Sequence, residues 1–121
     1  MESPSGNTLS RNERLKSKIS IATLMKKGRW GSCSGLKYCY LNGTGSESNH
    51  IMVSVPKRFF KRAVKRNLLK RRLREAYRTQ KQLLTLEGGT DIMFLYNTAD
   101  ILDFQTIKET VASILTQISE K

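Results

Sequence analysis

The chain has 121 residues, with 22 lysines and arginines against ten acidic residues and a net charge of +12 at pH 7. This length suits one domain with a modest core, and a hydrophobic content of 38% is above that of disordered chains. No apolar run approaches the roughly 20 residues that cross a bilayer, and the first residues have neither the basic nor the apolar region of a signal peptide. A cytoplasmic protein with no membrane partner is expected.

The first elements are a polar tail and a helix. Residues 1–8 predict a disordered tail, and residues 9–121 predict a single folded domain. Ser10, with a glutamate three residues on, forms a capping-box pattern, and Gly28 after two lysines is a typical stop. We therefore expect a helix over residues 10–27. Its apolar side would consist of Leu15, Ile19, Ala22, Leu24 and Met25.

Strands and a turn are expected next. Residues 35–41 suit a strand, and residues 50–55 alternate apolar and polar side chains as a half-buried strand does. Between them, residues 42–49 are rich in Gly, Ser and Asn, which is turn chemistry. A further piece of strand is plausible over residues 30–34.

Residues that usually bind metals or carry out catalysis are sparse. Cys33 and Cys39 lie six apart, which is neither a zinc nor a redox spacing. On one extended strand they would share a face about 20 Å apart, too far for a disulfide, so reduced thiols are expected. His50 is the only histidine and is expected at the surface. Because the carboxylates are scattered and no P-loop is present, neither a metal site nor a self-sufficient nuclease site is expected.

The segment 57–81 contains twelve lysines and arginines and one glutamate, or +11 of the total charge. On a helical wheel one side is apolar, formed by Leu69, Leu73, Ala76, Tyr77, Leu83 and Leu84. The opposite side is polar, formed by Asn67, Arg71, Arg74 and Arg78. Phe60 and Val64 would fall on that polar side, so Phe59 to Val64 is expected as an entry turn and residues 65–84 as the helix.

The last elements are a strand over residues 91–96 and a helix over residues 103–118, with Asp103 as its N-cap. The helix should face inward with Ile107, Val111, Ile114, Leu115 and Ile118. The strand–helix–strand unit between residues 51 and 96 should pair its strands in parallel. The predicted fold class is α/β, an α+β two-layer sandwich of helices on a small sheet.

The concentration of positive charge in residues 57–81 predicts a polyanionic partner, because each phosphate that is neutralised releases condensed counterions. Arg and Asn also bring directional donors that suit shaped RNA. Twelve cations in one segment would repel one another without such a partner. The sequence therefore predicts an RNA-binding domain and no small-molecule substrate.

The segment from Ala63 to Tyr77 reads AVKRNLLKRRLREAY. It resembles the signature of the protein component of bacterial ribonuclease P, which runs Ala-Val-x-Arg-Asn-Arg-x-Lys-Arg-x-x-Arg-Glu-Ala and then an aromatic residue. The lead-in Val53 to Arg58 fits the strand that precedes this signature. Further matches are Arg14-Leu15-Lys16, Lys26-Lys27-Gly28 and the segment from Asp91 to Leu95, so the resemblance spans about residues 9–118.

The resemblance implies a four-stranded sheet with three helices, like the second domain of ribosomal protein S5, and a left-handed strand–helix–strand crossover. It also implies a role as the protein subunit of ribonuclease P. The partners would then be ribonuclease P RNA and precursor tRNA. The RNA would perform the magnesium-dependent removal of the 5′ leader, with Mg²⁺ bound mainly by the RNA and no catalytic residue on this chain.

Two sets of site residues follow from the charge pattern and the resemblance. The RNA-binding set is Lys57, Arg58, Arg62, Lys65, Arg66, Asn67, Lys70, Arg71, Arg74 and Arg78. The second set would line a cleft between the first helix and the sheet that takes the leader, and consists of Ile21, Met25, Lys37, Cys39, Met52 and Ser54.

The chain departs from the family pattern at three places. Leu68 replaces the second arginine of the Arg-Asn-Arg core, and nearby Arg62, Lys65 and Arg72 are extra charges that would offset the loss. The aromatic positions of the first helix are Ile21 and Met25, which would contact the leader without ring stacking. Asn97 ends the late strand where the family often has a basic residue.

Three alternatives remain open at this stage. A ribosomal or other RNA-scaffold protein would share the size and charge, although such proteins more often carry basic extended tails. A DNA-binding regulator would need a helix-turn-helix pattern, which is not evident. A stand-alone nuclease would need the clustered carboxylates that the chain lacks.

Overall fold

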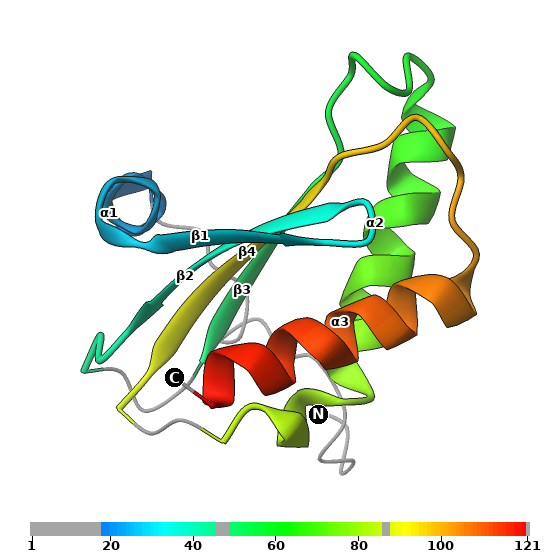
Figure 1. Cartoon of the computed structure of the whole chain (residues 1–121). Coiled ribbons are helices and arrows are strands. Elements are labelled where there is room, and N and C mark those ends of the chain that lie inside the picture. The colour runs from blue at the N-terminus through cyan, green and yellow to red at the C-terminus, as the bar shows by residue number, and fades with distance from the viewer. Residues whose placement is uncertain (1–17, 46–48, 86–87, 121) are drawn as a thin grey trace, which may run out of the picture.

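The structure is a computed structural model that describes residues 18–45, 49–85 and 88–120. It contains three α-helices and four strands, which confirms the predicted fold class (Figure 1). The elements in chain order are α1 (Lys18–Lys27), β1 (Arg29–Cys33), β2 (Leu36–Asn42), β3 (His50–Ser54), α2 (Ala63–Arg78), the 3-10 helix η2 (Lys81–Leu83), β4 (Thr90–Tyr96) and α3 (Phe104–Ser119).

The four strands form one sheet in the order β1-β2-β4-β3. β1 pairs antiparallel with β2 and β2 pairs antiparallel with β4, while β3 runs parallel to β4. The predicted parallel pairing of the strands on either side of α2 is therefore confirmed. The plausible strand piece at residues 30–34 is a full strand, and it forms a hairpin with β2 through Ser34 and Gly35, which both adopt positive φ.

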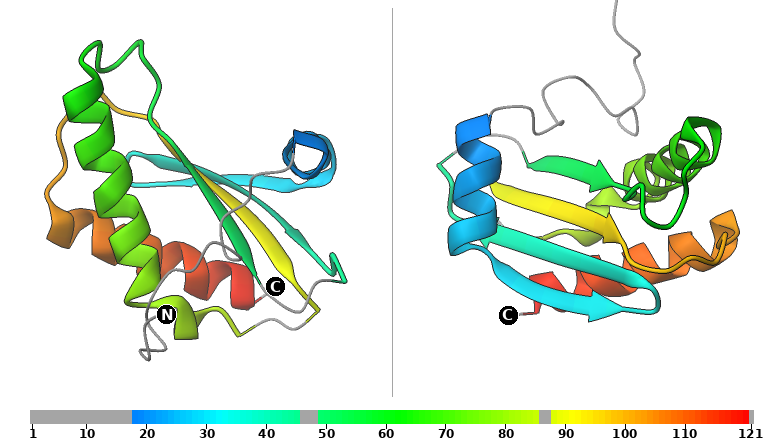
Figure 2. Two further views of the ribbon diagram at one scale, coloured as in Figure 1. Left: turned by 180° about the vertical axis from the view of Figure 1, so that it is seen from behind. Right: turned by 90° about the horizontal axis from the view of Figure 1, so that it is seen from above.

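One face of the sheet is covered by α2 and α3, and the main core lies in this layer. Figures 1 and 2 show both helices on this side of the sheet, with α1 at the opposite end of the molecule from α2. Alternate residues of each strand enter the core, as the period of two requires. They include Leu36, Tyr38 and Tyr40 from β2, Ile51 and Val53 from β3, and Ile92, Phe94 and Tyr96 from β4.

The helix α3 begins where the sequence indicates. The Asp103 side chain accepts a hydrogen bond from the Thr106 backbone N–H at 2.8 Å, which confirms the predicted N-cap. This bond holds the pKa of the Asp103 carboxyl below its ordinary value, because it favours the ionised form. The five apolar residues predicted to face inward, which are Ile107, Val111, Ile114, Leu115 and Ile118, are all buried.

The loop between β4 and α3 is held by side chains from two neighbouring elements. The Tyr96 hydroxyl donates to the Asp100 carbonyl at 2.5 Å and accepts from the Leu102 backbone N–H at 2.8 Å. Arg72 on α2 donates through Nη1 to the Leu102 carbonyl at 2.6 Å. Burial raises the pKa of Tyr96, so its hydroxyl keeps the proton that it donates.

The second face of the sheet is covered only in part, by α1. Leu24 is fully buried there against Cys39 and Met93, and the Cys39 thiol donates to the Leu24 carbonyl at 3.2 Å. Met25 was expected on the same apolar side, but its side chain is 49% exposed, because successive helical residues point about 100° apart. The predicted first part of this helix, including its Ser10 cap, lies outside the described residues.

The bounds of α2 differ from the prediction at both ends. The helix begins at Ala63, two residues early, and Val64 is exposed on its first turn. Phe60 was expected to pack separately from the apolar side of the helix, and this is confirmed. Its ring lies edge-on to the ring of Tyr96, with 5.7 Å between the ring centres. At the other end α2 stops at Arg78, and Leu84 reaches the core from the segment after η2 instead.

The two cysteines do not lie on one strand as expected. Because the hairpin turn separates them, Cys33 lies opposite Leu36 on the core face and Cys39 lies opposite Trp30 on the other face. Both thiols are free, as predicted. Within residues 18–45, 49–85 and 88–120, no helix is long and apolar enough to cross a membrane.

Gly28 sets how closely α1 approaches the sheet. A Cβ at this position would lie 2.4 Å from the Leu24 carbonyl oxygen and 2.5 Å from the Cys39 sulfur. Gly28→Ala is therefore expected to lower the free energy of unfolding by about 1–3 kcal/mol, because α1 must shift from the sheet. Urea unfolding measures this, with Ser32→Ala on exposed β1 as the control that should change stability little. Equal stability of the two variants would contradict the close packing.

Candidate nucleic-acid interface

The predicted RNA-binding side chains lie on one continuous piece of structure, the turn after β3 followed by α2. We call this surface the basic face. It consists of Lys57, Arg58, Arg62, Lys65, Arg66, Asn67, Lys70, Arg71, Arg74 and Arg78, none of which is buried. The opposite side of α2 carries Leu69, Leu73, Ala76 and Tyr77, all buried in the core as predicted.

The buried side of α2 explains the direction of the charged side. Four apolar residues fix the rotation of the helix on the sheet, so side chains half a turn away point outward. Asn67 and Arg71 lie one turn apart and are both exposed, while Arg74 and Arg78 continue this row half-buried. A rigid row of donors at one-turn spacing can contact successive groups along a nucleic-acid backbone.

Arg66 on the basic face is bonded to the backbone of the entry turn. Its Nη1 donates to the Phe60 carbonyl at 2.7 Å and to the Lys61 carbonyl at 2.8 Å. These bonds close the entry turn ahead of α2, whose N-cap residue Arg62 makes no side-chain capping bond. Arg66 thus fixes the turn that precedes α2. Both of these bonds use Nη1 of its guanidinium.

Arg72 does not compensate for Leu68. The sequence suggested that Arg72 adds an outward charge, but its guanidinium points to the Leu102 carbonyl and ties α2 to the loop before α3. Arg62 and Lys65, the other two extra cations, are exposed. Leu68 itself is half-buried beside the row.

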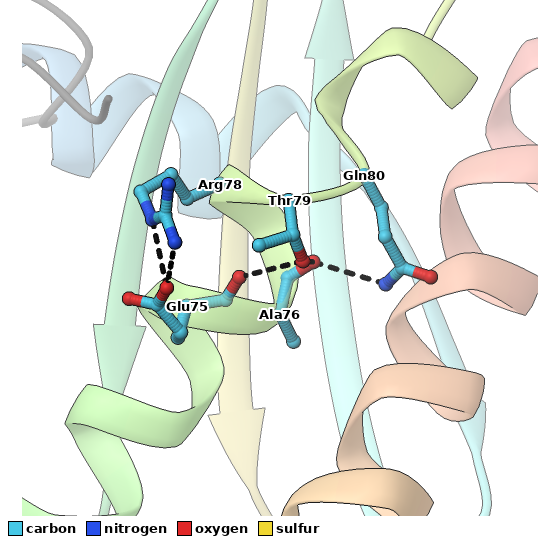
Figure 3. A network of polar contacts seen from close by, with 5 residues as sticks. All are labelled: Glu75, Ala76, Arg78, Thr79 and Gln80. Atoms are coloured by element: carbon cyan, nitrogen blue, oxygen red, sulfur yellow. Dashed lines mark hydrogen bonds and ion pairs between the residues drawn. The ribbon is translucent and has the colours of Figure 1, made fainter. Parts of the chain in front are cut away.

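The C-terminal end of α2 is held by a network of polar contacts (Figure 3). Arg78 donates to the Glu75 carboxylate through Nε at 2.8 Å and through Nη2. This contact lowers the pKa of Glu75, because it favours the ionised carboxylate. Gln80 then bridges two helices, since its Nε2 donates to the carbonyls of Ala76 and Lys108, each at 2.9 Å. Part of the Arg78 charge is therefore neutralised by Glu75.

The predicted leader-binding residues gather on the second face of the sheet. Strand register places Trp30, Cys39, Met93 and Met52 in one row across all four strands. The next row contains Ser32, Lys37, Leu95 and Ser54. We call the accessible residues of these two rows, which are Trp30, Ser32, Lys37, Met52, Ser54 and Leu95, the open face.

The structure brings most, not all, of the predicted cleft residues to accessible positions. Lys37, Met52 and Ser54 belong to the open face, and Ile21 and Met25 are half-buried and exposed on α1 beside it. Cys39 is the exception, because α1 covers it completely. Its role is to seat α1, and it cannot touch a ligand in this conformation.

Two features of this face were missed from the sequence. Trp30 is 49% exposed on the edge strand. To predict which face its side chain occupies, the register of the hairpin is needed, and the turn at Ser34 determines that register. His50 was expected as a surface residue, and its contact with Asp91 was not foreseen: its Nδ1 lies 3.2 Å from Asp91 Oδ1, across the parallel pair of β3 and β4. The alternation along the two strands could have indicated that pairing, because it puts His50 on the face of Met52 and Asp91 on the face of Met93.

A metal site does not form among the described side chains. Nowhere in residues 18–45, 49–85 and 88–120 do three or more His, Cys, Asp or Glu side chains come close enough to hold an ion. The donors on the basic face are cations and an amide, which suit phosphate oxygens and not Mg²⁺. What this surface can do chemically is bind a polyanion.

Sequence comparisons match the chain to known proteins over nearly its whole length. The family model described as Ribonuclease P matches residues 9–119. The chain is 33% identical to the ribonuclease P protein component of Porphyromonas gingivalis over 98% of its own length and 92% of that protein, and 32% identical to that of Borrelia hermsii over 92% and 96%.

Solved structures share the fold. The Staphylococcus aureus RNase P protein is similar with a TM-score of 0.75 and 22% identity, over 88% of this chain and 94% of that one. The Thermotoga maritima RNase P protein is similar with a TM-score of 0.75 and 24% identity, over 87% and 96%.

The two thiols are expected to react at different rates. Burial raises the pKa of the Cys39 thiol, and α1 covers its sulfur, whereas Cys33 is only half-buried. Alkylation of the native protein at mildly alkaline pH should therefore modify Cys33 first and reach Cys39 only on unfolding. Peptide mass mapping over time measures the order. Early modification of Cys39 would mean that α1 leaves the sheet readily.

Proposed function

The chain belongs to the ribonuclease P protein family, and from that premise we propose that it is the protein subunit of ribonuclease P. In this role it binds the ribonuclease P RNA and the 5′ leader of precursor tRNA. It thereby assists the endonucleolytic cut that produces the mature 5′ end of the tRNA. The observation that carries the proposal is the basic face, a fixed row of cations in a domain that is otherwise close to neutral.

The basic face is assigned to the ribonuclease P RNA. Eleven of the twelve net charges lie in residues 57–81, which form the entry turn, α2 and the start of η2. A folded RNA presents its phosphates at fixed positions, so a rigid helix loses little entropy on binding them. Asn67 and Arg71 add directional donors in the middle of the row.

The open face is assigned to the leader. A single-stranded RNA needs cations for its backbone and accessible apolar or aromatic surface for its bases. Lys37 supplies a cation, and Met52 and Leu95 supply apolar surface beside it. Ile21 and Met25 on α1 would form the second wall, giving the soft apolar contact expected where the family has aromatic residues.

The chemistry is assigned to the RNA. In this proposal the RNA would hold most of the Mg²⁺, which would supply the Lewis-acid chemistry of the cut, and this chain would supply no catalytic residue. The donor set of this chain supports that division, because its described surface offers cations for phosphates and no cluster of metal ligands. The chain binds and orients the substrate in the cytoplasm, where its free cysteines stay reduced.

Reconstitution tests the function directly. The protein is mixed with a bacterial ribonuclease P RNA and a precursor tRNA at low millimolar Mg²⁺. Leader release should be faster than with RNA alone, and protein alone should release nothing. RNA binding without stimulation would favour a ribosomal or other scaffold role, and cleavage by protein alone would overturn the assignment of chemistry to the RNA.

A matched pair of neighbouring arginines tests the basic face. Arg71→Ala removes an exposed cation, so it should weaken binding of ribonuclease P RNA and reduce the salt dependence by about one charge. Arg72→Ala removes the bond to the Leu102 carbonyl, so it should instead lower the free energy of unfolding by about 1–3 kcal/mol. Salt titrations of RNA affinity and urea unfolding of both variants measure the two effects. The same salt slope in wild type and Arg71→Ala would contradict the assigned direction of the row.

A further inference from the structure

The edge of the sheet beside α1 carries Trp30, the one aromatic residue of the open face, and a pocket that the assignments above leave unused. Trp30 is the only tryptophan of the chain and is 49% exposed on β1. A pocket of about 300 Å³ lies beside the start of the same strand. Its lining residues are Lys27, Arg29, Tyr40, Leu41 and Asn42.

The hairpin register explains why the two features are neighbours. β1 begins at Arg29, opposite Tyr40, so Leu41 and Asn42 of β2 continue past the end of their partner strand. The chain between α1 and β1 turns at Gly28, next to this uncovered edge. Successive strand residues point to opposite faces, so Arg29 lies on the pocket side and Trp30 on the open face.

The pocket has the donors of an anion site. Lys27 and Arg29 are both exposed cations, and among the described residues no acidic side chain lines the pocket. The Asn42 Oδ1 accepts a hydrogen bond from the Thr90 hydroxyl at 3.2 Å, which leaves the amide nitrogen of Asn42 as a donor. Two cations and one amide donor suit a phosphate group.

The nearest carboxylate in the register does not compete for these cations. Asp91 lies opposite Leu41 across β2 and β4, but its side chain is 9% exposed and lies 3.2 Å from His50 Nδ1. The pocket therefore keeps its positive character. The accessible indole of the next residue, on the other face of the edge strand, offers a flat surface on which any nucleobase can stack.

We propose that Trp30 and the Lys27–Arg29 pocket form a nucleotide subsite for single-stranded RNA, in which one base stacks on the indole and an adjacent phosphate enters the pocket. The inference deepens the proposed function, on which it rests, because the RNA that reaches this edge is the leader after it crosses the open face. Trp30 lies in the same row as Met52, at the opposite edge of the sheet. The indole supplies the stacking surface that Ile21 and Met25 lack.

The sole tryptophan makes the subsite directly observable. A short single-stranded RNA oligonucleotide is titrated into the protein while tryptophan fluorescence is recorded, which should be quenched on stacking. Trp30→Ala, followed by fluorescence anisotropy of a labelled oligonucleotide, should lose about fivefold in affinity, whereas Trp30→Phe should recover part of it. The double variant Lys27→Gln with Arg29→Gln should reduce the salt dependence by one to two charges, and the control Lys108→Gln on α3 should not.

Holoenzyme assays connect the subsite to the leader. Wild type and Trp30→Ala are reconstituted with a bacterial ribonuclease P RNA and compared on precursor tRNAs with a long leader and with a single-nucleotide leader. The variant should bind the long-leader substrate about fivefold more weakly than wild type. Its affinity for the single-nucleotide-leader substrate should equal that of wild type. Equal affinity of both proteins for the long leader, with normal stimulation of cleavage, would overturn the leader assignment while the proposed function stands.

The oligonucleotide titration decides the subsite even if reconstitution fails. Quenching that depends on Lys27 and Arg29, in a protein that does not stimulate cleavage, would support a single-stranded RNA site and refute the subunit role. Absence of quenching, with the thermal unfolding of each variant matching wild type, would overturn the subsite itself.

Discussion

The constraint on which the rest of the structure depends is mutual repulsion along α2. A helix with this many cations on adjacent turns is unfavourable in isolation, since like charges at one-turn spacing destabilise it. The helix persists because Leu69, Leu73, Ala76 and Tyr77 bury its other side in the core. Burial of each large apolar side chain contributes about 1.5–3 kcal/mol, which exceeds the few tenths that each surface charge pair costs.

Three arginines of this segment also act inside the protein. Arg66 closes the entry turn, Arg72 fixes the loop before α3, and Arg78 is held by Glu75. Each donates hydrogen bonds to a carbonyl or a carboxylate of the protein. The positive charge that α2 presents to solvent is therefore smaller than the number of its cations suggests. The same bonds fix both ends of the helix and the loop beside it, and so keep the remaining cations at constant spacing.

The sequence was sufficient for much of this arrangement. Periodicity predicted the strands and the inward face of α3, because burial of one face leaves a regular pattern. The helix between the two strands predicted their parallel pairing. It could not predict where α2 ends, since Gln80 and its bond to Lys108 on α3 are long-range. The prediction that Cys33 and Cys39 share one face of a strand was wrong for a related reason, because a two-residue turn at Ser34 and Gly35 reverses the chain between them. Trp30 was missed because its side depends on that same register.

The order of the elements connects the basic face and the open face. β3 presents Met52 and Ser54 to the open face, and the chain then enters the turn that carries Lys57 and Arg58. That turn is rigid, because Phe60 is buried against Tyr96 and the Arg58 guanidinium lies 4.8 Å from the centre of the Phe59 ring. A leader on the open face and a structured RNA on α2 would therefore be held at a fixed relative position. Such positioning is what a subunit without catalytic groups can contribute, because correct placement of the substrate lowers the entropic part of the barrier.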